Sequence, residues 1–224
     1  YHGLMTATPP DPRDPFGHPA LGESVRALAR RGVIHEYRRG RILIGEGETG
    51  DTVYVILRGR LRVFGTDART GREMTYGLYG PGEYVGEMGL DGGPRSASVE
   101  VHEAATCSMI TRATLLAHIA EHPGFAFELL AKVIARARAA TTTAKQLAHS
   151  DAYTRMKSLL MRLAVAQPDG SFRLEEALTQ QEIADWIGCA RELVGRMLKD
   201  LEKGGFLEVE GTGKNRRLRW RRLP

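Results

Sequence analysis

The chain has 224 residues, of which 42% are hydrophobic and 26% charged, which is typical of a globular protein with one large domain or two smaller ones. Its formal net charge of +5 permits a nucleic-acid partner without requiring one. The two cysteines, Cys107 and Cys189, are far apart and the sequence has no His/Cys cluster, which argues against a metal or iron–sulfur site. The sequence has no signal peptide and no apolar run long enough to span a bilayer, which predicts a cytoplasmic protein with reduced thiols.

The N-terminal half is predicted to be rich in β-strands. Residues 1–19 are rich in Pro and Asp and predict a flexible leader, and residues 20–31 predict a short helix. Short apolar segments separated by Gly or Asp follow at 33–37, 42–44, 53–57, 61–64, 74–79, 97–101 and 106–110. Such segments indicate a sandwich or barrel, and a short helix is expected near 113–121.

A long helix is predicted from Phe125 to about His149, because this stretch has no Gly or Pro. A seam of apolar and small residues alternates spacings of three and four along it: Phe127, Leu130, Ile134, Ala137, Thr141, Ala144 and Ala148. The seam favours a homodimeric coiled coil. Packing of this face against the β-rich half is the alternative.

The C-terminal part predicts a helix-turn-helix. A helix at 152–166, a break at 167–170 and a short strand at 172–174 precede it. Thr179-Gln180-Gln181-Glu182 forms a capping box that begins one helix, which Gly188 ends. A second, amphipathic helix begins near Ala190 and stops at Gly204. Two short helices joined through a glycine are typical of DNA-binding proteins.

The second helix carries the predicted base contacts. Arg191, Glu192 and Arg196 lie on its exposed side, and the first two are in the turn that meets base edges in a major groove. A solvated charged face without function is the alternative. Thr179 and Gln180 complete the predicted DNA-binding face. Segments 206–210 and 215–220 predict a wing whose basic residues, Lys214 included, contact phosphate.

A candidate anion site lies in the β-rich half, where segment 80–90 runs into Pro94-Arg95-Ser96-Ala97. Gly86 allows a ligand to approach the backbone, and Glu87 can accept a hydrogen bond from a ribose hydroxyl. Arg95 offers a planar fork for phosphate, to which Ser96 adds donors. A surface ion pair between Glu87 and Arg95 is the alternative.

These motifs carry a resemblance to a known family. The cassette Gly86-Glu87-Met88-Gly89-Leu90 with Arg95-Ser96-Ala97, then a long helix, then Ile187 to Arg196, closely resembles the CRP/FNR superfamily of transcription regulators, and within it the cyclic AMP receptor protein family. The resemblance covers about residues 20–220. It implies an α+β protein with a leader (1–19), a cyclic-nucleotide-binding-like β-roll (20–122), a central dimerisation helix (123–149) and a winged helix-turn-helix (150–224).

The resemblance also implies a ligand set. Residues of the cassette (Gly86, Glu87, Met88, Arg95, Ser96) match the phosphate–ribose site for a cyclic nucleotide, cyclic AMP or cyclic GMP. Arg136 matches an arginine that contacts the cassette glutamate. The family's adenine-contacting pair, Thr-Ser, is Ala140-Thr141 here, so Thr141 alone keeps a hydroxyl, which could reach the partner subunit's ligand.

The implied partners follow from the same resemblance. Arg191, Glu192 and Arg196 match the base-contacting residues of the family, which implies a TGTGA-like palindromic site in double-stranded DNA, a homodimer and contact with RNA polymerase. A ligand-independent regulator with a vestigial β-roll is the alternative. No catalytic motif is found, and the scattered His102, His118, His122 and His149 are interpreted as surface or hydrogen-bonded residues, so an enzyme is not expected.

Overall fold

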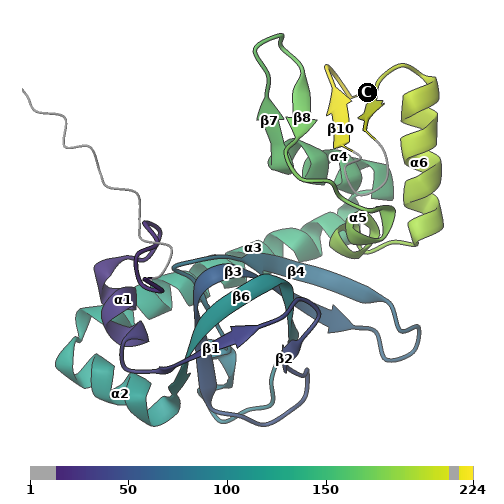
Figure 1. The fold of residues 1–224 in the computed structure, drawn as a ribbon. Coiled ribbons are helices and arrows are strands. Elements are labelled where there is room, and N and C mark those ends of the chain that lie inside the picture. Colours follow the sequence, from purple (N-terminus) through teal and green to yellow (C-terminus); the bar gives the residue numbers. More distant parts are fainter. Residues whose placement is uncertain (1–13, 212–216, 224) are drawn as a thin grey trace, which may run out of the picture. The chain divides into compact units, whose positions relative to one another are not determined.

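The computed structural model describes residues 14–211 and 217–223. They form two compact units, drawn in Figure 1. The first comprises the described part of Tyr1–Gly65 with Tyr76–Ile134, and the second comprises Thr66–Thr75 with the described part of Ala135–Pro224. The units divide within the long helix. The boundaries expected between leader, β-roll, central helix and winged helix-turn-helix, after residues 19, 122 and 149, stay predictions.

The first unit is an antiparallel β-roll with helices at one end (Figure 1). Its elements are α1 (Glu23–Ala29), β1 (Val33–Tyr37), β2 (Ile42–Ile44), β3 (Thr52–Thr66), β4 (Glu73–Tyr79), β5 (Tyr84–Val85), the 3-10 turn η1 (Glu87–Gly89), β6 (Ser98–Thr111) and α2 (Arg112–Glu121). The end of β3 and the start of β4, within Thr66–Thr75, are assigned to the second unit. The strand order is β1-β6-β3-β4, with β2 paired to β6 and β5 to β3. Alternate side chains of β3 and β6 fill its two apolar cores.

The sequence predicts four strands where the structure has two long ones, β3 and β6. Gly59, with φ +74°, was expected to separate two strands. It instead lies in a bulged part of β3, where the register against β6 shifts three times between Ile56 and Leu61. A Cβ at Gly59 would lie 2.2 Å from the Ala104 carbonyl oxygen, so the glycine permits close strand approach rather than a chain break.

His118 on α2 corrects one expectation. It is 1% exposed, and neither ring nitrogen has a hydrogen-bond partner among the described residues. Its ring packs 4.7 Å from that of His122 and 5.0 Å from that of Phe125. His118 lies three residues after the buried Leu115, on the same inward face of α2. Burial lowers the pKa of His118, and the neighbouring His122 and Arg31 lower it further.

The last residues of the predicted leader pack against α1. Gly17 N donates to Asp14 O in a turn, and Arg26 Nε on α1 donates to Phe16 O at 3.1 Å. Arg58 Nη2 donates to Asp14 O at 2.9 Å. These contacts place residues 14–17 on the first unit; residues 1–13 lie outside the described residues.

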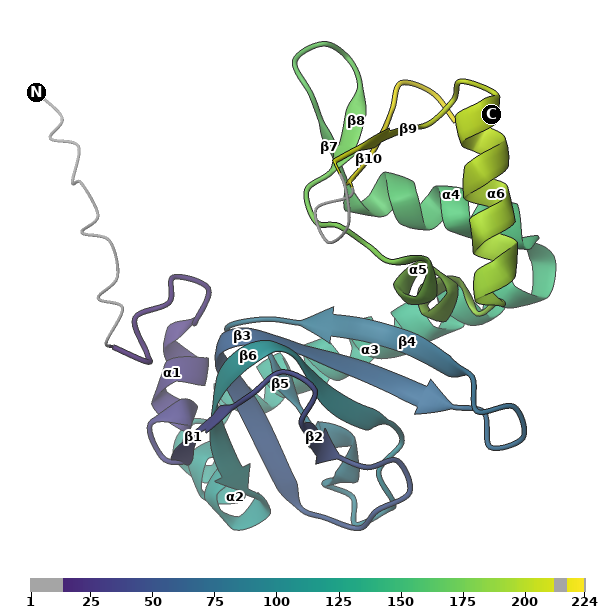
Figure 2. The same ribbon diagram turned by 45° about the vertical axis from the view of Figure 1, so that its right-hand side comes forward.

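The predicted long helix is α3 (Gly124–His149). The second unit continues with α4 (Ala152–Leu163), β7 (Ala164–Ala166), β8 (Phe172–Leu174), α5 (Gln180–Ile187), α6 (Arg191–Lys203), β9 (Glu208–Glu210) and β10 (Arg217–Trp220). In Figure 2 the three helices α4 to α6 gather beside the four-stranded sheet, whose order is β7-β8-β10-β9. One apolar cluster joins helices and sheet.

The helix predicted over 152–166 ends three residues early. Ala164 is extended, with ψ 144°, and residues Ala164–Ala166 pair with β8. Local propensity favours helix for this stretch, but pairing with Phe172–Leu174 overrides it. Within the described ranges 14–211 and 217–223, no helix combines the length and apolarity needed to cross a membrane. Cys107 and Cys189 are free thiols, and burial raises the pKa of Cys107 to about 12.

Candidate ligand and DNA sites

The cassette begins where β5 ends. Gly86 follows Val85 directly and has a φ of +94°, which a glycine adopts without strain. A Cβ here would also lie 2.7 Å from the Thr52 carbonyl oxygen. The chain then turns through η1, which carries Glu87, 7% exposed, and Met88, 56% exposed. The motif therefore forms a tight backbone turn at the edge of the β-roll.

Arg95 lies inside this turn, 6% exposed. Its Nη1 donates to the Gly86 carbonyl, and its Nη2 donates to Thr52 O at 2.9 Å and to Thr52 Oγ1 at 3.3 Å. The backbone around it is fixed as well, since Arg95 N donates to Glu48 O at 2.8 Å. The guanidinium is thus oriented by backbone oxygens before any ligand contact, which suits recognition of a phosphate.

Two glycines make room for this guanidinium: Gly50, which the sequence analysis missed, and Gly89, which it named only as part of the cassette motif. A Cβ at Gly50 would lie 3.0 Å from Arg95 Nη2, and one at Gly89 would lie 2.8 Å from Arg95 Nη1. Thr52, its main acceptor, was also missed. Gly50 and Thr52 lie more than 40 residues before Arg95, so no local motif connects them to it.

The structure brings the predicted cassette residues together. Ser96 is exposed beside Met88, and its hydroxyl donates to the Met88 sulfur at 3.5 Å. Glu87 and Arg95 are both buried, so the alternative of a surface ion pair is wrong. The arrangement offers a buried cation, a hydroxyl and a carboxylate at one turn, which can bind an anion that also carries a hydroxyl group.

Two further predicted ligand residues lie on α3 beyond Ile134, in the second unit. Arg136 is half-buried. Thr141 is exposed, and its hydroxyl donates to Ala137 O at 3.0 Å, which leaves its oxygen able to accept. Their contact with the cassette ligand stays a prediction.

The predicted seam of α3 is exposed in the single chain. Phe127 is 76% exposed, Leu130 52% and Ile134 41%. Ala137, Thr141, Ala144 and Ala148 are exposed as well. The alternative, burial of this stripe against the β-rich half, is wrong for the first unit, because Phe125 and Leu129 provide the packed face instead.

The helix-turn-helix forms as the sequence predicts. Glu182 N donates to Thr179 Oγ1 at 3.1 Å, and Thr179 N donates to Glu182 Oε2 at 2.7 Å, which completes the capping box. Gly188 ends α5 in the left-handed region, with φ +64° and ψ 49°. The two helices share a buried core, whose α5 and α6 members are Ile183, Ala184, Ile187, Val194, Leu198 and Leu201.

The candidate base-contacting residues lie on the solvent side of α6. Arg191, Glu192 and Arg196 are all exposed. Gln180 lies against the same helix, because a Cβ at Gly195 would be 3.1 Å from its Oε1. Thr179 is exposed next to it. Lys214 lies outside the described residues, so its phosphate contact stays a prediction.

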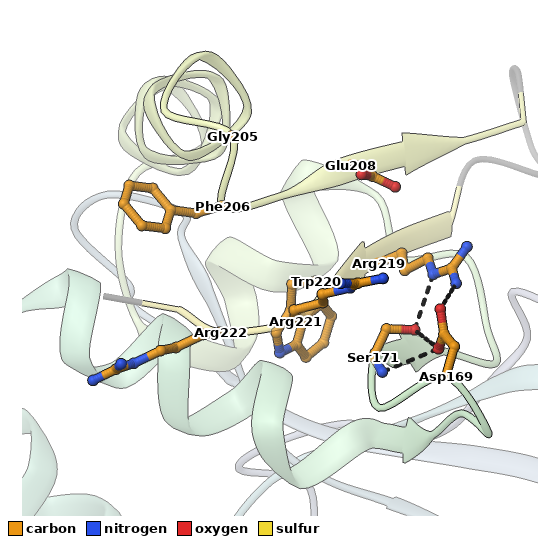
Figure 3. Close-up of a pocket in the computed structure, with 9 residues that line it drawn as sticks. All are labelled: Asp169, Ser171, Gly205, Phe206, Glu208, Arg219, Trp220, Arg221 and Arg222. Carbon is orange, nitrogen blue, oxygen red and sulfur yellow. Dashed lines mark hydrogen bonds and ion pairs between the residues drawn. The ribbon is translucent and has the colours of Figure 1, made fainter.

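A cavity of about 390 Å³ lies on the wing side of the second unit (Figure 3). On one side Arg219 pairs with Asp169, and its Nε donates to Ser171 Oγ at 3.0 Å. Phe206 and Arg222 lie on the other side (Figure 3). Arg219 also pairs with Glu210 at 3.0 Å, so it ties β10 to β9 and to the β7–β8 turn. None of the predicted site residues that the structure describes lines this cavity.

Together these features define a class of protein: a transcription regulator with an effector-binding β-roll followed by a DNA-binding helix-turn-helix. Residues 34–122 match the family model for the cyclic nucleotide-binding domain, and residues 177–207 match the family model for bacterial regulatory proteins of the crp family.

Curated relatives agree with this class. The chain is 32% identical over 185 residues to the cAMP-activated global transcriptional regulator CRP of Escherichia coli, covering 80% of this chain and 86% of that protein. It is 31% identical over 192 residues to the CRP-like cAMP-activated global transcriptional regulator of Mycobacterium tuberculosis, covering 84% and 85%. The chain belongs to the CRP family of transcription regulators.

Solved structures share the fold. The catabolite activator protein of Thermus thermophilus is 29% identical, with a TM-score of 0.52 over 93% of this chain and 94% of that one. The c-di-GMP responsive regulator CLP of Xanthomonas campestris has a TM-score of 0.76 over 86% and 96% of the two chains, at 23% identity, and supports the fold alone. In the part of the chain that the structure describes, no group of three or more His, Cys, Asp or Glu side chains could hold a metal ion.

Proposed function

We propose that this regulator is a homodimer whose affinity for a TGTGA-like palindrome is controlled by a cyclic nucleotide, with cyclic AMP as the leading candidate. The observation that carries the ligand half is the buried guanidinium of Arg95, oriented by Gly86 and Thr52 at the cassette turn. A buried cation at such a turn favours a bound anion, since a guanidinium has five N–H donors and those not directed at Gly86 and Thr52 can donate to phosphate oxygens.

The chemistry of the cassette suits a cyclic nucleotide. Arg95 and the Ser96 hydroxyl would bind the phosphodiester, and the Glu87 carboxylate would accept from the ribose hydroxyl. The two curated relatives are named as cAMP-activated, which supports cyclic AMP. The Ala140 side chain cannot hydrogen-bond to a base, so base selectivity would rest on Thr141, and cyclic GMP is the second ligand to test.

The DNA half rests on the exposed first turn of α6. Arg191 would donate two hydrogen bonds to guanine O6 and N7, and Glu192 would accept from cytosine N4. A homodimer would present two such helices about 34 Å apart, one turn of DNA, which requires a near-palindrome. Ligand binding would favour the pose with this spacing by shifting a pre-existing equilibrium.

The dimer would form through α3. Its exposed stripe starts with large side chains, Phe127 and Leu130, and ends with small ones, Ala144 and Ala148, so two helices could pack closely at one end. As a transcription regulator it would act in the cytoplasm and contact RNA polymerase. A ligand-independent regulator is the second candidate, which the alanine at position 140 favours.

Fluorescence anisotropy tests the proposal with a palindromic TGTGA duplex and a scrambled duplex at fixed salt, without ligand and with cyclic AMP or cyclic GMP. We expect one nucleotide to tighten specific binding at least tenfold, about 1.4 kcal/mol of coupling. Equal, tight binding in all conditions would favour the ligand-independent regulator. Equal binding to both duplexes in every condition would refute the proposed base contacts.

A further inference from the structure

The strand that carries the cassette is packed against helix α3 at two points. Phe125 and Lys132 are seven residues apart on α3, two turns, and so share one face. The Tyr84 ring on β5 lies 6.4 Å from the Phe125 ring, and Lys132 Nζ lies 4.8 Å from the Tyr84 ring centroid. Tyr84 is 2% exposed. The ammonium therefore faces a buried aromatic ring, a favourable cation–π contact.

Lys132 also contacts the backbone just before β5. Its Nζ donates to the Gly82 carbonyl at 3.0 Å. Gly82 is itself fixed, because its N–H donates to Ile56 O at 3.0 Å and its φ is +83°. A Cβ at Gly82 would lie 2.1 Å from Ala20 O, so this position holds only glycine. One half-buried ammonium thus contacts both the turn and the ring that begin the cassette strand.

The contact lies close to the ligand site along the chain. Tyr84 and Val85 form all of β5, and Gly86 and the buried Glu87 follow immediately. Two residue pairs, Tyr54 with Val85 and Val55 with Tyr84, join β5 to β3. So short a strand has few backbone hydrogen bonds of its own, and the contacts of Lys132 add to them from α3.

We infer that Lys132 is a positioning residue that fixes the cassette strand against α3 and thereby transmits ligand binding to that helix. This inference rests on the proposed function of the cassette as a ligand site. The ammonium is the part that matters, since its charge faces both the Tyr84 ring and the Gly82 carbonyl, whereas the aliphatic stem supplies packing alone. Arginine can make both contacts, and methionine can make neither.

Hydrogen exchange followed by mass spectrometry tests the positioning without any ligand. Lys132→Met should raise amide exchange in the segment 82–89 at least threefold, and Lys132→Arg should restore protection. The control is Lys145→Met, which removes an exposed lysine from the same helix. Unchanged exchange in Lys132→Met would overturn the inference, even if the chain bound no nucleotide at all.

The second readout is the ratio of DNA affinities with and without cyclic AMP. Lys132→Met should lower this ratio at least threefold, leave ligand-free DNA affinity within twofold of wild type, and be rescued by Lys132→Arg. An equal loss of DNA affinity with and without nucleotide would mean a structural role only and would overturn transmission. A wild-type ratio of one would count against the proposed function, while the exchange measurement would still decide the positioning.

Discussion

Arg95 donates through Nη1 to the carbonyl oxygen of Gly86, nine residues earlier, and this bond lies inside a ring of glycines. Gly50, Gly86 and Gly89 each come so close to the guanidinium that a Cβ would lie within about 3 Å of it. These three glycines therefore contribute in two different ways. Gly86 adopts a positive φ, and Gly50 and Gly89 leave the volume that the arginine occupies.

Gly89→Ala should weaken cyclic-nucleotide binding about tenfold, which corresponds to roughly 1.4 kcal/mol. The added methyl would lie 2.8 Å from Arg95 Nη1 and 3.0 Å from Gly50 O, so the guanidinium must move from the position in which it donates to Gly86 and Thr52. Isothermal titration calorimetry measures the affinity. Gly22→Ala is the control, because nothing lies within 4 Å of its Cβ. Wild-type affinity in Gly89→Ala would show that the arginine can shift without loss.

Leu130→Asp should convert the proposed dimer to a monomer, because it places a charge among the large apolar side chains of the α3 seam. Leu116 offers a matched control on α2: it is 50% exposed, compared with 52% for Leu130, but lies off the seam. Sedimentation equilibrium at micromolar concentration measures the mass. We expect Leu116→Asp to stay dimeric. A dimeric Leu130→Asp, or a monomeric wild type, would count against the seam as the interface.

The elements that the sequence predicted well are those specified locally. The capping box of Thr179 and Glu182 involves residues three apart, and the left-handed turn at Gly188 needs only one residue. Both features can therefore be predicted from the local sequence alone. The same holds for the cassette, whose Gly86 and Glu87 adjoin in sequence.

The features that were missed depend on distant partners. Thr52 and Gly50 meet Arg95 only because β3 folds beside the cassette, and Lys132 meets Gly82 across 50 residues. Gly59 looked like a strand end because a glycine weakens a strand, yet its close contact with Ala104 makes it a bulge. His118 was predicted to be a surface or hydrogen-bonded residue, since residue type alone does not reveal that packing of α2 buries it.

Asp169→Asn should destabilise the protein at neutral pH and have little effect in acid. Hydrogen bonds from the Ser171 hydroxyl and amide, and then Arg219, lower the pKa of Asp169 from 3.8 to about 2. A pKa lowered on folding stabilises the native state above the unfolded value, and this contribution is lost as pH falls through about 2. Urea denaturation should show a difference in free energy of unfolding between the variant and wild type at neutral pH. This difference should disappear between pH 4 and pH 2.

The control for that experiment is Asp200→Asn, which changes an exposed carboxylate on α6. Its difference in free energy of unfolding from wild type should stay the same over this pH interval. A constant gap for Asp169→Asn across the whole range would mean that its charge does not stabilise the fold.

Arg191→Ala should weaken sequence preference while sparing non-specific binding. The side chain is exposed in the first turn of α6, and loss of a bidentate contact to guanine costs about 1–3 kcal/mol, or roughly 5- to 150-fold in affinity for the specific duplex. Arg222→Ala removes the same charge from the same unit, beside the wing cavity and away from α6's first turn. Anisotropy titrations with palindromic and scrambled duplexes at matched salt separate the two effects. Arg222→Ala should weaken binding to both duplexes equally or not at all, whereas Arg191→Ala should weaken binding to the palindrome more than binding to the scrambled duplex. If both variants lowered the affinity for both duplexes by the same factor, Arg191 would contribute only its charge. The base contact assigned to it would then have to be abandoned.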